Sequence, residues 1–151
     1  LNVCSARLAQ TFGAGVPLSD NRVFAQFAKS ALNKTDIILH TMGQSEGNYC
    51  YTADTVYGIF VLLQKGEKGQ SYNVARNHST ILNMAKMVAD KIGNNQIKAE
   101  VRIPENLGGL GYAPDVKLKL NSDKLKALGW QPEMDLENMF KRMIRSWELQ
   151  E

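Results

Sequence analysis

The sequence predicts an α/β protein whose first segment is a core strand of a parallel sheet. The apolar stretch 1–12 runs directly into a loop that contains Gly13 and Gly15, as buried strands of such sheets do. Extended and amphipathic helical segments then alternate along the chain, which is the pattern of an α/β fold. An apolar strand buried on both faces normally belongs to a sheet with further strands before it. We therefore expect the C-terminal part of a larger α/β protein.

Hydrophobic spacing predicts the first helix and the strands after it. Asp20 and Asn21 precede a stretch whose apolar residues recur at helical spacing, namely Phe24, Phe27, Ala28, Ala31 and Leu32. Residues 36–40 form a short apolar strand. The polar, glycine-containing residues 42–48 form a loop of the kind that carries ligands. Residues 49–51 return to extended structure.

Two longer helices are expected in the middle of the chain. The first is capped by Asp54 and ended by Gly66. Its inward face carries Val56, Ile59, Phe60 and Leu63. Residues 70–75 form the next strand. The second helix is capped by Ser79 and ended by Gly93. Its inward face carries Ile81, Met84, Ala85, Val88 and Ile92.

The last third of the chain is predicted from alternation and from turn residues. Residues 96–103 form a half-buried strand, with Ile97, Ala99, Val101 and Ile103 on one side. The glycine-rich residues 105–114 are expected to form a mobile loop. Residues 117–120 alternate as another strand, and Ser122 begins a short helix. Asp135 caps the final helix, whose apolar stripe is Leu136, Met139, Phe140, Met143, Ile144 and Trp147.

Composition excludes several classes of protein. The 151 residues are 44% hydrophobic and 22% charged, which is ordinary for one globular domain. No apolar run approaches the roughly 20 residues of a membrane helix and no signal-peptide pattern is present, so we expect a cytoplasmic protein with no membrane partner. The net charge of +3 comes from scattered side chains, which argues against nucleic acid and fits a phosphate-bearing small ligand. Cys4 and Cys50 lack metal-site spacing, so we expect free structural thiols and no metal.

Five short motifs, in order, carry a resemblance to a known family. They are Arg7-Leu-Ala-Gln10-Thr11-Phe12-Gly13-Ala14-Gly15, Asp20-Asn21-Arg22-Val23, Tyr51-Thr52-Ala53-Asp54, Tyr72-Asn73-Val74-Ala75 and Leu128-Gly129-Trp130-Gln131-Pro132. Together they resemble the C-terminal half of extended short-chain dehydrogenase/reductases, the NAD-dependent nucleotide-sugar epimerase/dehydratase family. The resemblance implies that residues 1–15 give the last core strand and loop of a Rossmann-type domain. The whole of 1–151 would then be its C-terminal, substrate-binding α/β region.

The resemblance also implies which residues meet a ligand. The positions of Thr11 and Arg22 lie near the cofactor NAD. The positions expected to contact a nucleotide-diphosphate sugar are Gln10, Val23, His40, Asn73, Lys117 and Lys119. Several of these residue types have ordinary structural explanations as well. Arg22 is also explained as a solvated residue at a helix start, His40 as a surface residue, and the two lysines as charges that protect an edge strand.

The family pattern is broken just before Tyr49. Many relatives carry an Arg two residues before that aromatic, where it pairs with the nucleotide diphosphate. Gly47 stands at this position here. The change removes a bidentate phosphate contact. Lys117, Lys119 or Arg76 are the candidates to supply the missing charge.

By this resemblance, the parent protein oxidises a nucleotide-activated hexose at C4 with bound NAD and then epimerises, dehydrates or decarboxylates it. We expect a homodimer at full length. The family's catalytic Tyr-x-x-x-Lys pair and its glycine fingerprint for NAD do not occur in these 151 residues. We therefore expect no catalytic residue here, NAD bound mainly by another part of the protein, and an inactive isolated chain. The alternative is a non-enzymatic module of the same fold that binds a nucleotide or a partner.

Overall fold

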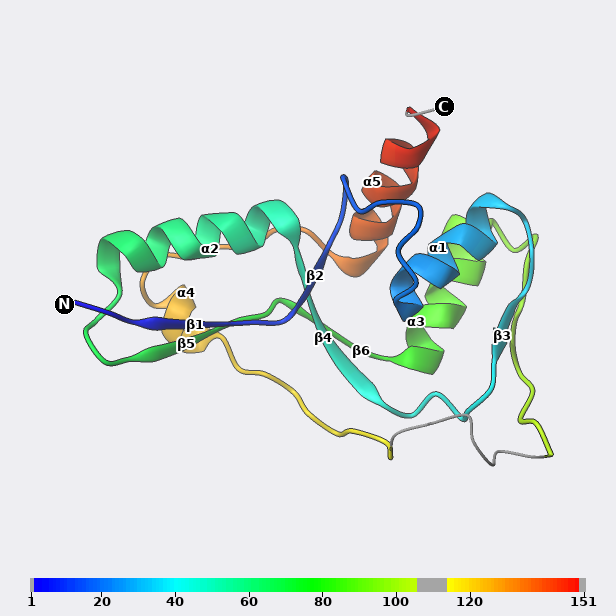
Figure 1. Ribbon diagram of the computed structural model, residues 1–151, viewed down its shortest axis with the longest axis horizontal. Helices are drawn as coiled ribbons and strands as arrows, with labels where there is room; N and C mark the ends of the chain where they lie inside the picture. Colours follow the sequence, from blue (N-terminus) through cyan, green and yellow to red (C-terminus); the bar gives the residue numbers. More distant parts are fainter. Residues whose placement is uncertain (1, 106–113, 150–151) are drawn as a thin grey trace.

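The computed structural model describes residues 2–105 and 114–149. In Figure 1 the elements form two groups joined by the long strand β4 (Glu46–Tyr51). One group contains β1 (Ser5–Leu8), β5 (Ser71–Val74), α2 (Thr52–Lys65) and α4 (Asp123–Lys126). The other contains α1 (Val23–Leu32), β3 (Ile37–Leu39), α3 (Ile81–Met87) and α5 (Leu136–Glu148). Within the described residues, no helix is long and apolar enough to span a membrane.

The first strand of the chain is divided between two sheets. β1 pairs in parallel with β5, and after Ala9 the chain continues as β2 (Gln10–Phe12), which pairs in parallel with β4. β4 also pairs antiparallel with β6 (Asn77–Thr80), a strand that the sequence analysis missed. β3 pairs in parallel with β7 (Ala99–Val101). These parallel pairs, connected through helices, confirm the predicted α/β class.

The prediction that the first strand is buried on both faces is wrong for its first half. All four residues of β1 are exposed, and Leu8 keeps 50% of its surface accessible. Among the described residues β1 pairs with β5 alone, so its other edge stays open to solvent. The second half behaves as predicted, because β2 ends in Phe12, which is fully buried.

The larger core lies between β2, β4 and the helices α1, α3 and α5. Phe12 stacks on Phe24 with 4.2 Å between the ring centroids and meets Tyr49 and Phe140 edge-on. The buried residues of α1 and α5 confirm the inward faces predicted for both helices. Asp135 caps α5 as predicted, because its carboxylate accepts a backbone N–H of the first turn.

The smaller core lies under α2, around Trp130. This side chain is fully buried, and its indole N–H donates to the carbonyl of Asp54 at 2.8 Å. Asp54 is not the helix cap that the sequence predicts, because α2 begins at Thr52 and Tyr51 is its N-cap residue. The Asp54 carboxylate instead accepts the backbone N–H of Met134 and so holds the chain that leads to α5.

The predicted inward face of α2 is also wrong. Val56, Phe60 and Leu63 are exposed and Ile59 is half-buried. The buried residues are Thr55, Gly58, Val61 and Leu62. The helix carries apolar residues on both sides, so hydrophobic spacing does not decide between them. Gly58 lies on the buried side, where a Cβ would lie 3.0 Å from the Trp130 indole nitrogen, so glycine favours the close approach of this ring.

Two further boundaries differ from the predictions. Thr80 caps α3 with its hydroxyl, whereas Ser79, the predicted cap, belongs to β6. The chain then continues from α3 into a π-helix over Val88–Ile92. The strand predicted for 96–103 forms only as β7, and Val101 and Ile103, predicted to share its buried side, are exposed. The cap differs because β6 runs up to Thr80, and the later strand is shorter because only Ala99–Val101 pair with β3.

Residues 114–121 run beside β4 without forming the predicted strand. The Asn48 side chain takes the place of a strand partner, because its amide nitrogen donates to the Leu118 carbonyl at 2.7 Å and its oxygen accepts the Leu120 N–H at 2.8 Å. Ser122 precedes α4 as predicted, but its hydroxyl bonds to the Ala75 backbone and not to the helix. The expected mobile loop, 105–114, lies almost wholly outside the described residues.

Replacing Phe12 with alanine tests how much the aromatic cluster contributes to the free energy of unfolding. The change removes a fully buried ring, so the free energy of unfolding should fall by about 3–5 kcal/mol. Phe60→Ala is the matched control, because that ring is 63% exposed and its loss should change stability by about 0.5 kcal/mol at most. Urea unfolding followed by tryptophan fluorescence measures both variants. Equal losses would contradict the orientation of α2.

Candidate functional site

A cavity of about 390 Å³ opens at the carboxyl end of β3 and the N-terminal end of α1. The residues that line it include Val23, Phe27, Leu39, His40, Ser45 and Asp115. Open α/β sheets bind ligands outside the carboxyl ends of their parallel strands. The cavity therefore lies where this class of fold places a ligand, and it has the size of a small-molecule site.

The cavity combines an apolar wall with a few polar groups. Phe27 and Leu39 are buried and give it apolar surface. His40, at the end of β3, is exposed, and its ring nitrogen Nδ1 lies 3.3 Å from the Arg102 carbonyl, which orients the imidazole. Thr41 adds a hydroxyl on the same side of the cavity. Such a mixture suits a flat, partly polar ring.

A glycine turn sets the shape of one side of the cavity. Gly43 has a φ of +64°, and a Cβ there would lie 2.9 Å from the Leu82 nitrogen, so this turn requires glycine. The Leu82 N–H donates to the Gly43 carbonyl and the Ile81 N–H to the Ser45 carbonyl, which fixes the turn to the start of α3. The Ser45 hydroxyl donates to the Asp115 carboxylate at 2.8 Å. That bond brings the segment 114–121 to the cavity.

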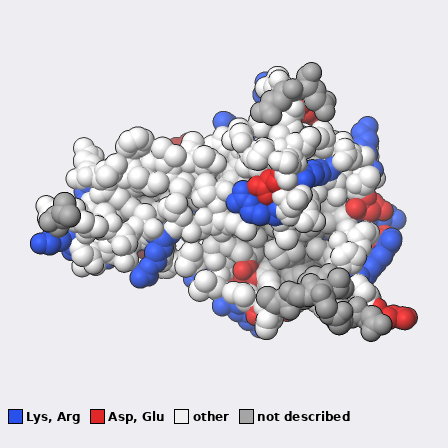
Figure 2. Space-filling model, in the orientation of Figure 1, with Lys and Arg blue, Asp and Glu red and all other residues white. Residues whose placement is uncertain are grey.

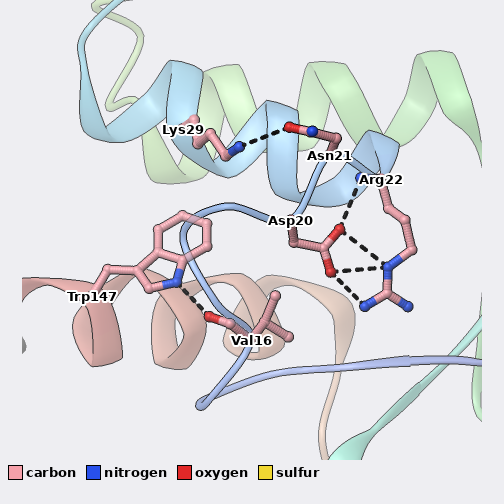
Figure 3. A network of polar contacts seen from close by, with 6 residues as sticks. All are labelled: Val16, Asp20, Asn21, Arg22, Lys29 and Trp147. Carbon is pink, nitrogen blue, oxygen red and sulfur yellow. Dashed lines mark hydrogen bonds and ion pairs between the residues drawn. The ribbon is translucent and has the colours of Figure 1, made fainter.

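The loop before α1 is fixed by an ion pair and by a tryptophan (Figure 3). Nη2 of Arg22 lies 2.6 Å from the Asp20 carboxylate, and Nε donates to it at 3.0 Å. These hydrogen bonds lower the pKa of Asp20 and raise the pKa of Arg22. The Trp147 indole N–H donates to the Val16 carbonyl at 2.6 Å and ties the same loop to α5. In this structure the Arg22 guanidinium therefore holds the loop in place through Asp20.

The structure brings two of the predicted substrate residues together. Val23 and His40 both line the cavity. Gln10 lies on β2 with an exposed side chain, directly beside β4. Lys117 and Lys119 are exposed in the segment that runs beside β4, and neither lines the cavity.

Other residues singled out in the sequence bond within the chain. The Thr11 hydroxyl donates to a backbone carbonyl and lies 3.3 Å from that of Thr55. The Asn73 amide donates to the Asn121 carbonyl at 2.8 Å. The Arg76 guanidinium donates to the carbonyls of residues 132 and 133, between α4 and α5. Thr11, Asn73 and Arg76 thus make hydrogen bonds that connect segments of this chain.

Sequence reasoning missed most of the cavity. Gln26 and Phe27 lie one helical turn after Val23 on the same face of α1, and this spacing is a signal that could have found them. Ser45 lies in the loop that was expected to carry a ligand. Asp115 gives no signal in the sequence, because it reaches the cavity only through a bond to a residue 70 positions away.

Gly47 is required by close packing. Its φ lies outside the left-handed region, but an added Cβ would overlap the hydroxyl of Tyr49. The side chain of Tyr49 thus fills the space that a larger residue at 47 would need. An arginine at 47 would have to displace this ring.

The surface is mixed in charge (Figure 2). On this face basic and acidic side chains alternate over much of the molecule, while the surface over α2 is nearly free of charge. The exposed apolar residues of that helix are Val56, Tyr57, Phe60 and Leu63. In the part of the chain that the structure describes, no cluster of His, Cys, Asp or Glu could hold a metal ion. Cys4 and Cys50 are free, and burial raises the pKa of Cys50 to about 11.

Residues 1–75 match the NAD dependent epimerase/dehydratase family. This chain belongs to that family. The match confirms the resemblance that the sequence motifs carry. Among curated relatives, mouse dTDP-D-glucose 4,6-dehydratase is 24% identical over 124 residues, which are 82% of this chain and 35% of that protein. UDP-glucuronic acid decarboxylase 2 of Arabidopsis thaliana is 27% identical over 146 residues, 94% of this chain and 31% of that protein. The chain thus spans about a third of these relatives.

Solved structures of epimerases share the fold. UDP-glucose 4-epimerase from Thermotoga maritima, determined with UDP-glucose, has a TM-score of 0.74 at 20% identity and matches 97% of this chain and 46% of that chain. UDP-glucuronic acid 4-epimerase from Bacillus cereus, in complex with UDP-glucuronic acid and NAD, has a TM-score of 0.75 at 14% identity. This match covers 100% of this chain and 46% of that chain. The predicted fold class is confirmed, because nearly the whole chain matches a part of these Rossmann-type structures.

The residues expected near NAD make hydrogen bonds within the chain. The polar atoms of Thr11 and Arg22 are engaged by Thr55 and Asp20. Gly15 has a φ of +89° in an open turn, but its N–H donates to the Ser146 hydroxyl at 3.3 Å and is not free for a phosphate. Thr11, Arg22 and Gly15 thus make local contacts in this structure, and the roles of Thr11 and Arg22 toward NAD stay predictions.

Arg22→Gln should release the Asp20 carboxyl. Hydrogen bonds from Arg22 hold the pKa of Asp20 below 3.8, so the variant should raise that pKa toward 3.8. Because the folded-state pKa is depressed, the pair stabilises the fold above the ordinary pKa and loses this effect as pH falls through the folded value. Arg22 is half exposed, so the loss at pH 7 should stay below about 1 kcal/mol. A ¹³C NMR titration of the carboxyl measures the shift, and an unmoved pKa would contradict the pairing.

Proposed function

We propose that this chain is the substrate-binding part of an NAD-dependent nucleotide-sugar epimerase, dehydratase or decarboxylase. In this proposal it holds a nucleoside-diphosphate hexose while another part of the protein, with NAD, oxidises C4. The observation that carries the proposal is the cavity at the carboxyl end of β3, because Val23 and His40, expected on independent grounds to meet the substrate, both line it. Epimerisation, 4,6-dehydration and decarboxylation are each compatible with this site.

The cavity suits the nucleoside end of such a ligand. Its volume of about 390 Å³ accommodates a base and a ribose, and Phe27 and Leu39 provide apolar surface for the ring. Thr41, Ser45 and Asp115 provide polar groups for its edges. The names of the relatives support a pyrimidine, because they act on or were determined with UDP-sugars or a dTDP-sugar.

The diphosphate would then lie along β4. The segment 114–121 is held beside this strand by Asn48 and by the bond between Ser45 and Asp115. Lys117 and Lys119 belong to this segment and are exposed, so their ammonium groups can swing toward a phosphate at the edge of the cavity. Arg76 is a weaker candidate, since backbone carbonyls already occupy its guanidinium.

We further propose that residues 1–15 belong to a cofactor-binding domain completed by additional chain, with NAD bound mainly there and the full protein a homodimer. The exposed β1, which pairs only with β5 among the described residues, supports this proposal. So does the length of the fold relatives, of which this chain matches 46%. An open parallel edge with apolar residues is the natural place for another strand.

The second candidate is a non-enzymatic binding module of the same fold. Gly47 favours it, because its lack of a side chain leaves no guanidinium for phosphate at this position. The local bonding of Thr11 and Arg22 points the same way. Turnover of a nucleotide sugar by the chain together with a cofactor-binding half would decide for the enzyme. Nucleotide binding without turnover in that mixture would decide for the module.

Calorimetric titration of the 151-residue chain with UDP and with dTDP tests the site. We expect saturable binding of at least one nucleotide. Val23→Trp places an indole in the cavity and should weaken that binding at least tenfold, since the ring competes with the base for space. Leu18→Trp is the control, because Leu18 is 47% exposed and does not line the cavity. A folded wild-type chain that binds neither nucleotide would overturn the proposal.

Replacing Lys117 and Lys119 together with glutamine tests the phosphate contact. If their ammonium groups meet the diphosphate, the dissociation constant for UDP-glucose should rise several-fold at low salt, and the difference should shrink at high salt as these charges are screened. Lys34→Gln with Lys68→Gln is a matched control, because both lysines are exposed and neither lines the cavity. Equal affinities of the two double variants at low salt would show that this site does not use Lys117 and Lys119.

A further inference from the structure

The hydroxyl of Tyr49 is a polar group with no hydrogen-bond partner among residues 2–105 and 114–149. The residue is 1% exposed, and its ring packs edge-on against Phe12 in the larger core. Every fully buried polar side-chain atom of the described residues has a hydrogen-bond partner, whereas no described residue bonds to this hydroxyl. The small exposed part of Tyr49 therefore includes its oxygen. Phenylalanine would pack equally well here, so the hydroxyl calls for another explanation.

The ring of Tyr49 leans along β4 toward Ser45, which lines the cavity, whereas Gly47 and Tyr49 lie next to the cavity lining and are not part of it. Alternation places residues 45, 47 and 49 on one face of β4 and the chain just before it. Ser45 lines the cavity, and the Tyr49 ring leans back along the strand over Gly47, since a Cβ at 47 would overlap its oxygen. Along this row no side chain lies between Ser45 and the hydroxyl of Tyr49. Because Gly47 has no side chain, none covers the hydroxyl at this position.

A second polar group lies beside this hydroxyl. Gln10 pairs directly with Tyr49 in the parallel ladder of β2 and β4, so the two side chains are on the same face of the sheet. Gln10 is exposed. Ser45, the Tyr49 hydroxyl and Gln10 are therefore three polar groups on one face of β4 and β2, and Ser45 lines the cavity.

We propose that the Tyr49 hydroxyl is a ligand-binding group, which donates a hydrogen bond to a phosphate oxygen of a nucleoside diphosphate held in the cavity. This inference rests on the proposed function and adds a binding residue to it. Burial raises the pKa of Tyr49, so the hydroxyl keeps its proton at neutral pH and remains a donor. A neutral donor that meets a charged oxygen forms a strong hydrogen bond without a cation.

Tyr49→Phe removes only the hydroxyl and keeps the ring, so the variant should fold. The probes are UDP and dTDP, each compared with its nucleoside, uridine or thymidine, which has no phosphate. The affinity for the diphosphate that binds the wild-type chain should fall about tenfold or more, while the affinity for the matching nucleoside stays unchanged. Tyr57→Phe is the control, because its hydroxyl bonds to the Gly129 carbonyl on α2's side of the molecule, outside the cavity.

Gly47→Ala is an independent variant, since the added methyl group must push the Tyr49 ring aside. It should weaken diphosphate binding in the wild-type background and have little further effect in Tyr49→Phe. Equal diphosphate affinity of the wild-type chain and Tyr49→Phe would overturn the inference and leave the proposed function standing. A wild-type chain that binds neither nucleosides nor diphosphates would instead overturn the proposed function, and the inference with it.

Discussion

The structure depends on one strand that belongs to two sheets. Up to Ala9 the chain is bonded to β5, and beyond it to β4. The first half therefore adjoins the smaller core around Trp130, and the second half delivers Phe12 to the centre of the larger one. A strand is stiff over such a short distance, so this connection, together with β4, which leads directly into α2, sets how the two cores face each other. The cavity is built on the larger core, and β1 projects away from it (Figure 1).

The parts of the fold that could be predicted are those in which one apolar stripe meets one core. α1 and α5 each bury a single face, and the helical spacing of their apolar residues identified that face. α2 has apolar residues on both sides, and its buried side includes Gly58, which packs closely against Trp130, 72 positions away. Residues 117–120 alternate as a strand does, but the side chain of Asn48 bonds to this segment where a strand would offer its backbone. Local pattern cannot report a partner so distant in sequence.

The same limit applies to the candidate site. Resemblance to the family identified Val23 and His40, because each stands at the boundary of an element that the sequence places well. It did not find Asp115, which reaches the cavity through Ser45, or the hydroxyl of Tyr49, which depends on an absent side chain at Gly47. It also assigned a ligand to Arg22, whose guanidinium is held by Asp20 in this chain. Residue type and position in the sequence suggested which side chains could bind a ligand. Only the contacts in the structure show which of these side chains already make hydrogen bonds within the chain.

The apolar outer face of α2 has a practical consequence. It carries Val56, Tyr57, Phe60 and Leu63 on one side of the helix, and the exposed strand β1 lies in the same group of elements. An uncharged helix face and an unpaired strand edge are the two surface features that most readily bring protein chains together. We therefore expect these two elements to favour association of the isolated chain in concentrated solution, because its modest net charge of +3 offers little repulsion against such contacts.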